Sequence, residues 1–189
     1  VEAELRALGI PFYLLRGNPV ETIPAFVQEH QIGHVVTDFN PLRFTNAWRT
    51  EVAKCLTIRM TEVDAHNVVP AWIASPKLEF AAYTIRPKIH RLLPEFLTTF
   101  LRVVAPVVTA ALPDAINWQS VTESLAVDES VVPVDWLQPG ATAAHARLRT
   151  FCDEELYEYA TKRNDPVLNQ VSHMSPYVHF GQLGAQRVA

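Results

Sequence analysis

The amino-acid sequence predicts an α/β protein in which a parallel sheet with helices on both faces is followed by a helical region. Helix-like and strand-like patterns take turns through residues 1–75. The strand-like runs there are rich in apolar residues, as in strands that are buried on both faces. From residue 140 the apolar residues instead recur at helical spacing. Together these patterns predict an α/β domain, a connector and the start of a helical domain.

The first 75 residues contain three predicted strands. The strands are expected at residues 11–17, 33–39 and 58–67. The helices are expected at residues 1–10, 19–31 and 41–56. Ile23, Phe26 and Val27 share one face of the second helix, and Pro41 suits the first turn of the third. Parallel strands joined in this way require right-handed crossovers.

The middle of the chain changes character. Residues 76–98 have a helical period, but Pro87 and Pro94 each remove a backbone donor and are expected to bend or end the helix. Residues 103–139 contain four prolines, five acidic residues and no basic one, with no sustained period. The domain boundaries predicted from these changes are 1–75 for the α/β domain, 76–139 for a helical segment with the connector, and 140–189 for the helical domain.

The last 50 residues are predicted to be helical. One apolar face is traced by Ala144, Leu148, Phe151, Leu156 and Tyr159. Farther on, Ser175 is expected to cap a helix that begins at Pro176, Gly181 suits the left-handed residue that ends a helix, and Gly184 begins another. Short helices in succession bring free N–H groups together, which suits an anion such as a pyrophosphate; the alternative is a capped helix pair.

Composition narrows the class of protein. With 49% hydrophobic and 19% charged residues and a net charge of -4, the chain has the composition of a soluble globular protein. Cys55 and Cys152 lie far apart and indicate neither a disulfide framework nor a zinc site, which favours a reducing compartment, the cytoplasm, or the nucleus in a eukaryote. No apolar run approaches the ~20 residues of a membrane span. The absence of a starting Met leads us to expect a fragment that lacks its beginning.

Two acidic residues follow predicted strands. Asp38 and Asp64 occupy the carboxyl ends of strands, where parallel sheets place their ligands. Each could equally cap the loop or helix that comes next. Neither a dinucleotide fingerprint nor a P-loop motif occurs.

Several segments together resemble one family. They are VVTDFNPLR, VDAHNVVPAWIAS, TIRPKIHRLLPEFL, YATKRNDP and SHMSPYVHFGQLGAQRVA. In this order they are similar to the DNA photolyase and cryptochrome family, most of all to the class II cyclobutane pyrimidine dimer photolyases. The resemblance covers most of the chain except the acidic connector.

The resemblance implies a fold, cofactors and a reaction. It implies a Rossmann-like N-terminal domain that can hold an antenna pigment of the deazaflavin type, and a helical domain that binds FAD. The enzyme, a deoxyribodipyrimidine photo-lyase, flips the dimer out of DNA, and blue light drives an electron from reduced FAD to it. The partner is therefore dimer-containing DNA, the protein is expected to be a monomer, and a fragment is expected to be inactive alone.

The resemblance also implies site residues. The flavin contacts are Tyr159 and the phosphate-binding turn Val171, Ser172, His173, Met174 and Ser175. Many relatives have Thr where Val171 stands, so a side-chain role is lost there. The antenna residues would be Asp38, Asp64, His66 and Asn67, and Arg163 would contact either DNA phosphate or an acid of its own domain. No catalytic residue and no metal ligand are expected, because the chemistry belongs to FAD.

Two other functions stay open. A cryptochrome-like blue-light photoreceptor would share the fold and FAD but would signal instead of repairing DNA. A flavin-free α/β module that binds a nucleotide or a partner would share only the first part of the chain.

Overall fold

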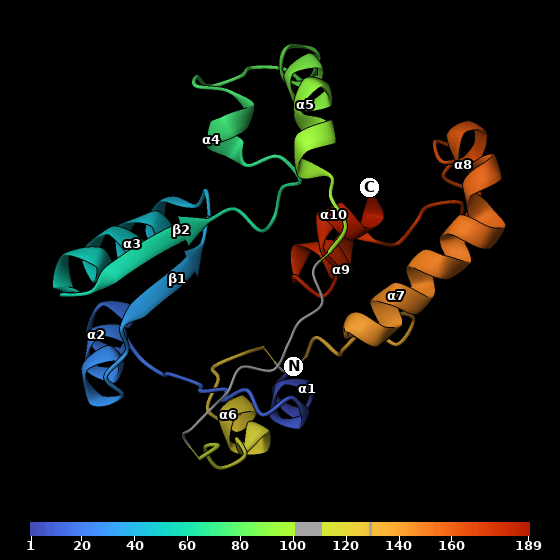
Figure 1. The fold of residues 1–189 in the computed structure, drawn as a ribbon. Coiled ribbons are helices and arrows are strands. Elements are labelled where there is room, and N and C mark those ends of the chain that lie inside the picture. The colour runs from blue at the N-terminus through green and yellow to red at the C-terminus, as the bar shows by residue number, and fades with distance from the viewer. Residues whose placement is uncertain (101–110, 129) are drawn as a thin grey trace. The chain divides into compact units, whose positions relative to one another are not determined.

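The computed structural model describes residues 1–100, 111–128 and 130–189 (Figure 1). By their contacts these residues divide into two compact units. The first unit comprises Val1–Glu62 with Phe100–Val134, and the second comprises Val63–Thr99 with Asp135–Ala189.

The first unit contains a two-stranded parallel sheet made of β1 (His34–Asp38) and β2 (Arg59–Val63). The helix α3 (Arg43–Cys55) connects the strands, and α2 (Pro19–Glu29) packs against α3. This is the βαβ arrangement that the alternating sequence pattern predicts.

Local chemistry explains where α2 begins and which face it buries. The Asn18 side chain accepts a hydrogen bond from the Val20 N–H, and Pro19 occupies the first helical position, where a missing N–H costs nothing. Val27 is the buried residue of α2, and Val52 is the buried residue of α3, at 2% exposure. An ion pair between Arg49 and Glu62 joins α3 to β2.

The predicted strand at residues 11–17 is not confirmed, because residues 11–17 belong to no strand in the part of the chain that the structure describes. An apolar run shows that a segment packs, but a strand also needs a neighbour with which to share hydrogen bonds. Although residues 13–17 are exposed, the ring of Tyr13 contacts α2. The Tyr13 ring lies 4.9 Å from the Phe26 ring and 5.1 Å from the His30 ring, both on α2.

The predicted connector contains a helix that the sequence pattern did not indicate. The helix α6 (Trp118–Glu123) begins at Asn117, whose side chain accepts from the Ser120 N–H, a capping signal visible in the sequence. Its segment joins α1 (Glu2–Ala7) through the Glu2 carboxylate, which accepts from the Ile116 N–H at 3.0 Å and from the Trp118 indole at 2.7 Å. Residues 101–110 of the connector lie outside the described residues.

The second unit is helical. Its elements are α4 (Ala71–Ala74), α5 (Ala82–Phe96), α7 (Ala141–Thr150), the π-helical turn η1 (Phe151–Glu155), α8 (Leu156–Lys162), α9 (Ser175–His179) and α10 (Ala185–Val188). Its core is a cluster of four buried side chains from α7, α9 and the segments beside α9. They are Ala144, Met174, Tyr177 and Leu183.

The helix α5 runs through both of its prolines, so of the two expected effects, bending or ending the helix, neither proline causes the second. Pro87 and Pro94 are seven residues apart and both are exposed. The carbonyls that lose their helical partners belong to Tyr83 and His90, which are exposed as well. Water can therefore satisfy those carbonyls, which removes part of the cost of proline inside a helix.

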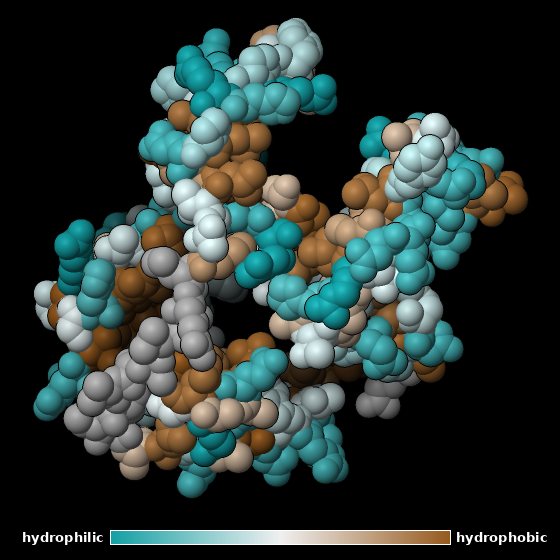
Figure 2. Space-filling view, turned by 45° about the vertical axis from the view of Figure 1, so that its right-hand side comes forward, coloured by the Kyte–Doolittle hydropathy of each residue, from teal (hydrophilic) through white to brown (hydrophobic). Residues whose placement is uncertain are grey.

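Hydrophobic side chains also reach the surface, in several areas that Figure 2 shows in brown. In the second unit Leu78, Phe80 and Tyr83 are 95%, 78% and 70% exposed. The rings of Phe80 and Tyr83 meet edge to face with centroids 5.8 Å apart. Exposed apolar clusters of this kind are typical of contact surfaces.

A polar cluster holds α5 to the segment before it. Lys88 on α5 donates to the Glu79 carboxylate and, at 3.0 Å, to the Ser75 hydroxyl, which donates to Glu79 at 2.7 Å. Only 6% of the Glu79 side chain is exposed. Hydrogen bonds from Lys88, then Ser75 and Thr84, lower the pKa of Glu79 to about 2.

This cluster predicts how stability depends on pH. Between about pH 2 and the ordinary Glu pKa of 4.5, the unfolded chain binds a proton at Glu79 that the folded chain does not. Stability from Glu79 is therefore complete above pH 4.5 and is lost as the pH falls toward 2. Urea unfolding at pH 6 and pH 3 should show a smaller difference in Glu79→Gln than in wild type. The exposed Glu95→Gln is the control, and equal differences in Glu79→Gln and wild type would refute the assignment.

Candidate functional site

The turn at residues 171–175 has a backbone geometry suited to anions. His173 has φ of 57°, in the left-handed region, and Met174 after it is in the right-handed helical region. Adjacent residues of opposite hand turn successive backbone N–H groups to one side, forming a concavity that binds anions. The Ser172 and Ser175 hydroxyls flank it, and the Met174 N–H makes a long contact of 3.4 Å with the Ser172 Oγ. Met174 itself is buried in the core cluster and fixes the turn from inside.

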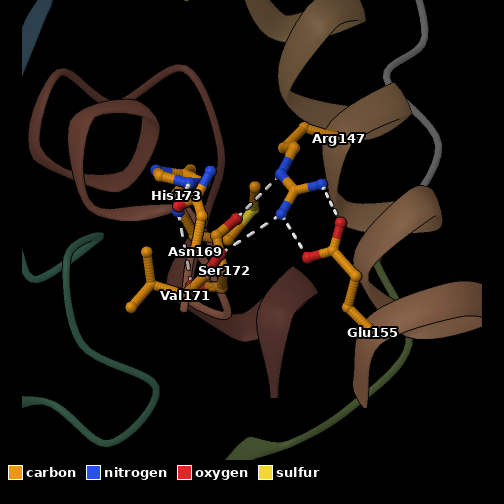
Figure 3. Close-up of polar contacts among 7 residues, drawn as sticks. Arg147, Glu155, Asn169, Val171, Ser172 and His173 are labelled. Carbon is orange, nitrogen blue, oxygen red and sulfur yellow. Dashed lines mark hydrogen bonds and ion pairs between the residues drawn. The ribbon is translucent and has the colours of Figure 1, made fainter. Parts of the chain in front are cut away.

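Arg147 on α7 holds the turn from the other side (Figure 3). Its Nε donates to the Ser172 carbonyl at 3.0 Å, and one Nη donates to the Val171 carbonyl at 3.2 Å. Both Nη atoms also donate to the Glu155 carboxylate, one of them at 2.6 Å. The hydrogen bond from Arg147 lowers the pKa of Glu155, and burial opposes this effect. Glu155 lies on the π-helical turn, a feature that often accompanies functional sites.

A pocket of about 690 Å³ lies beside this ion pair. The Trp136 ring and the His173 imidazole form part of its wall, with centroids 5.5 Å apart. His173 Nε2 and Asn169 Oδ1 are 2.9 Å apart, and the buried Tyr177 donates its hydroxyl hydrogen to the Gln138 carbonyl at 2.8 Å. The pocket therefore combines aromatic and polar groups within the second unit.

The structure shows where the helices around the turn begin and end. Gly181 has φ of 66° and ends α9, and Gly184 precedes α10, so both expectations are confirmed. Ser175 is the first helical residue of α9, with Met174 at the cap position and no side-chain cap. The expectation that Ser175 caps this helix was wrong, because the helix begins one residue earlier than the Ser-Pro pattern suggests.

Tyr159 and Arg163 form a group of their own on and next to α8. The Tyr159 ring meets the Phe151 ring edge to face at 5.2 Å, and the Arg163 guanidinium lies 5.3 Å from the Tyr159 centroid. Neither residue lines the pocket beside Arg147. The apolar face predicted for this helix does not include Leu156, which is 51% exposed. The predicted face assumed 3.6 residues per turn throughout the helix. The π-helical turn has more residues per turn, so the side chains that follow it lie on a different face from the one predicted.

The predicted antenna residues lie in different units. Asp38 lines a pocket of about 240 Å³ at the carboxyl end of β1 in the first unit. In the second unit the Asp64 carboxylate accepts from the Asn67 side chain and backbone and from the Ala71 N–H at 2.9 Å. Burial raises the pKa of Asp64, but these hydrogen bonds, the Asn67 side chain first, outweigh it and leave the pKa lowered. Asp64 and Asn67 thus shape the loop before α4, and His66 is an exposed residue of the same loop.

The sequence did not single out Arg147, Glu155, Trp136 or Asn169. Arg147 contacts residues 24 and 25 positions later in the chain, and no local spacing reveals such contacts. The run Asp153-Glu154-Glu155 did offer acidic partners for an arginine about two turns earlier. It could not show which of the three carboxylates faces Arg147.

The described residues contain neither a membrane-spanning helix nor a cluster of metal ligands. No helix there combines the length and the apolarity needed to cross a bilayer. Within the same ranges, no three His, Cys, Asp or Glu side chains gather in a way that could hold a metal ion.

Comparisons with known proteins identify one family. Residues 1–111 match the family model described as DNA photolyase. The deoxyribodipyrimidine photo-lyase of Potorous tridactylus is 42% identical over 190 residues, covering 99% of this chain and 36% of its own length. The corresponding protein of Arabidopsis thaliana is 41% identical over 197 residues, covering 98% of this chain and 40% of its own. The chain thus spans less than half the length of these relatives.

Solved structures agree at the level of the fold. A cryptochrome from Synechocystis sp. superposes with a TM-score of 0.64 at 17% identity, covering 91% of this chain and 38% of its own. A class III photolyase from Agrobacterium tumefaciens superposes with a TM-score of 0.55 at 18% identity, covering 91% of this chain and 37% of its own.

Proposed function

The chain belongs to the DNA photolyase family, and we propose that the protein uses FAD and blue light to repair cyclobutane pyrimidine dimers in DNA. The relatives with 30–42% identity over nearly the whole chain are named deoxyribodipyrimidine photo-lyases, which favours repair. The observation on this chain that carries the proposal is the anion-binding geometry of residues 171–175.

The residues present fit a flavin dinucleotide. The backbone N–H groups around His173, with the hydroxyls of Ser172 and Ser175, would hold its pyrophosphate. Tyr159 would contact the same cofactor from α8, and its ring is already oriented by Phe151 and Arg163. The chemistry that such a flavin supplies when bound is the transfer of one electron to the dimer in blue light, and its return after the ring opens. The residues of this chain would bind the cofactor and orient it.

Arg163 and Asp38 would contact two other partners, DNA and an antenna pigment. Arg163 would meet DNA phosphate with the guanidinium that lies over Tyr159. Asp38 would contact a deazaflavin-type antenna pigment in the first unit. The pocket of about 240 Å³ around Asp38 is smaller than the roughly 300–1,000 Å³ of ordinary small-molecule sites, so Asp38 would meet only part of such a pigment.

The likeness to a cryptochrome structure supports a second candidate, a blue-light photoreceptor with the same cofactor. That likeness, at 17% identity, concerns the fold alone. One experiment separates the functions. The whole protein would be purified, its flavin measured by absorption, and an oligonucleotide with one thymine dimer incubated with it in light and in darkness.

We expect bound FAD and loss of the dimer in light only. A protein that carries FAD but leaves the dimer intact in light would favour the photoreceptor. A protein that binds no flavin would contradict both functions and favour a flavin-free module.

A further inference from the structure

The Arg147 side chain directs its hydrogen bonds inward, although it lies near the surface. Four of them are formed, two to the Glu155 carboxylate and one each to the carbonyls of Val171 and Ser172. Only 21% of the Arg147 side chain is exposed, and Glu155 balances its charge. Four of the five guanidinium N–H groups are therefore used within the protein itself.

The two carbonyls that it binds determine where the next two N–H groups point. All peptide bonds in the described residues are trans. In a planar trans peptide the C=O and the N–H point in opposite directions. The Val171 carbonyl shares a peptide with the Ser172 N–H, and the Ser172 carbonyl shares one with the His173 N–H. Because both carbonyls point toward Arg147, both N–H groups point away from it.

This orientation coincides with the left-handed residue. His173, with φ of 57°, follows directly after the two fixed peptides. A left-handed conformation is unfavourable for a residue with a side chain, so the surroundings must hold it in place. Arg147 holds it from the N-terminal side, and the buried Met174 holds it from the C-terminal side.

We propose that Arg147 is a positioning residue, which fixes the Val171 and Ser172 carbonyls so that the Ser172 and His173 N–H groups face a bound anionic group. The inference rests on the proposed function, in which that group is the pyrophosphate of FAD. Glu155 orients the guanidinium and neutralises it. A lysine could not replace Arg147, because a single Nζ cannot reach two carbonyls and a carboxylate in the fixed geometry of the guanidinium fork.

The test compares Arg147→Lys with Arg149→Lys in the whole protein. Arg149 is exposed on the same helix and serves as the matched control. Two measurements are made on each variant: the dissociation constant of FAD, and amide hydrogen exchange at Ser172 and His173 with and without saturating FAD. Circular dichroism establishes that each variant is folded.

In wild type and in Arg149→Lys, FAD should slow exchange at the Ser172 and His173 amides. In Arg147→Lys the affinity for FAD should fall about tenfold or more, since two hydrogen bonds from a charged donor are lost. Protection at the two amides should be lost even when FAD is saturating. Glu155→Gln keeps an acceptor but not its charge, and should change both measurements in the same direction by a smaller factor. It serves as the test if Arg147→Lys does not fold.

Unchanged protection of both amides in the variants, whatever the affinity, would overturn the positioning role. FAD binding by wild type in that case would leave the proposed function standing. A wild-type protein that binds no FAD would overturn the proposed function, and this inference with it.

Discussion

Tyr177→Ala is expected to lower the free energy of unfolding by about 3–5 kcal/mol, the usual cost of removing a large buried aromatic side chain. Tyr177 is 3% exposed and packs in the cluster with Ala144, Met174 and Leu183. Its loss would leave a cavity beneath the turn at residues 171–175. Met174 packs against Tyr177 in this cluster and belongs to the turn, so the cavity would loosen the turn. Flavin retention should therefore fall together with stability.

Two controls separate packing from the hydrogen bond. Tyr177→Phe removes only the hydrogen bond to the Gln138 carbonyl and should cost about 1 kcal/mol. Tyr157 is 97% exposed, and Tyr157→Ala should change stability by no more than about 0.5 kcal/mol. Urea unfolding of the purified whole protein measures all three variants. If Tyr177→Ala cost no more than Tyr157→Ala, the cluster would not be the core of the second unit.

Val52→Asp is expected to destabilise the first unit by an amount on the order of 3–5 kcal/mol, because it buries a carboxylate with no partner supplied for it. Val52 is 2% exposed on α3, the helix that joins the two strands and packs against α2. Val36→Asp is the matched control, since Val36 on β1 is 60% exposed and its replacement should cost far less. Denaturant unfolding followed by circular dichroism compares the two. Equal losses of stability would show that Val52 does not lie in a packed interface.

Patterns that depend on near neighbours in the chain were predicted well. Gly181 was expected to end a helix because a left-handed residue is needed there, and it has φ of 66°. The helix from Pro19 was expected from its period and is capped by Asn18. Both features are determined by residues close together in the chain, and sequence patterns predict such local features best.

Features that depend on distant residues were not predicted. The run at 11–17 has the composition of a strand, but pairing is decided by another segment. The helix α5 continues past Pro87, and the residues whose carbonyls lose a helical partner are exposed, which depends on how the helix packs. The same holds for the site. The turn at 171–175 was expected, but Arg147 and Glu155, which hold it, are brought to it only by the tertiary fold.

The left-handed backbone at His173 also limits which residues evolution can place there. Glycine would adopt φ of 57° without strain, and asparagine would adopt it at little cost. Valine, isoleucine and threonine would be strongly disfavoured by their branched Cβ, and proline is excluded because its ring fixes φ near −65°. Among natural variants of this protein, position 173 should therefore vary in size and polarity while excluding β-branched residues and proline. The backbone conformation of the turn, and not the chemistry of the imidazole, would then determine which substitutions are tolerated at this position.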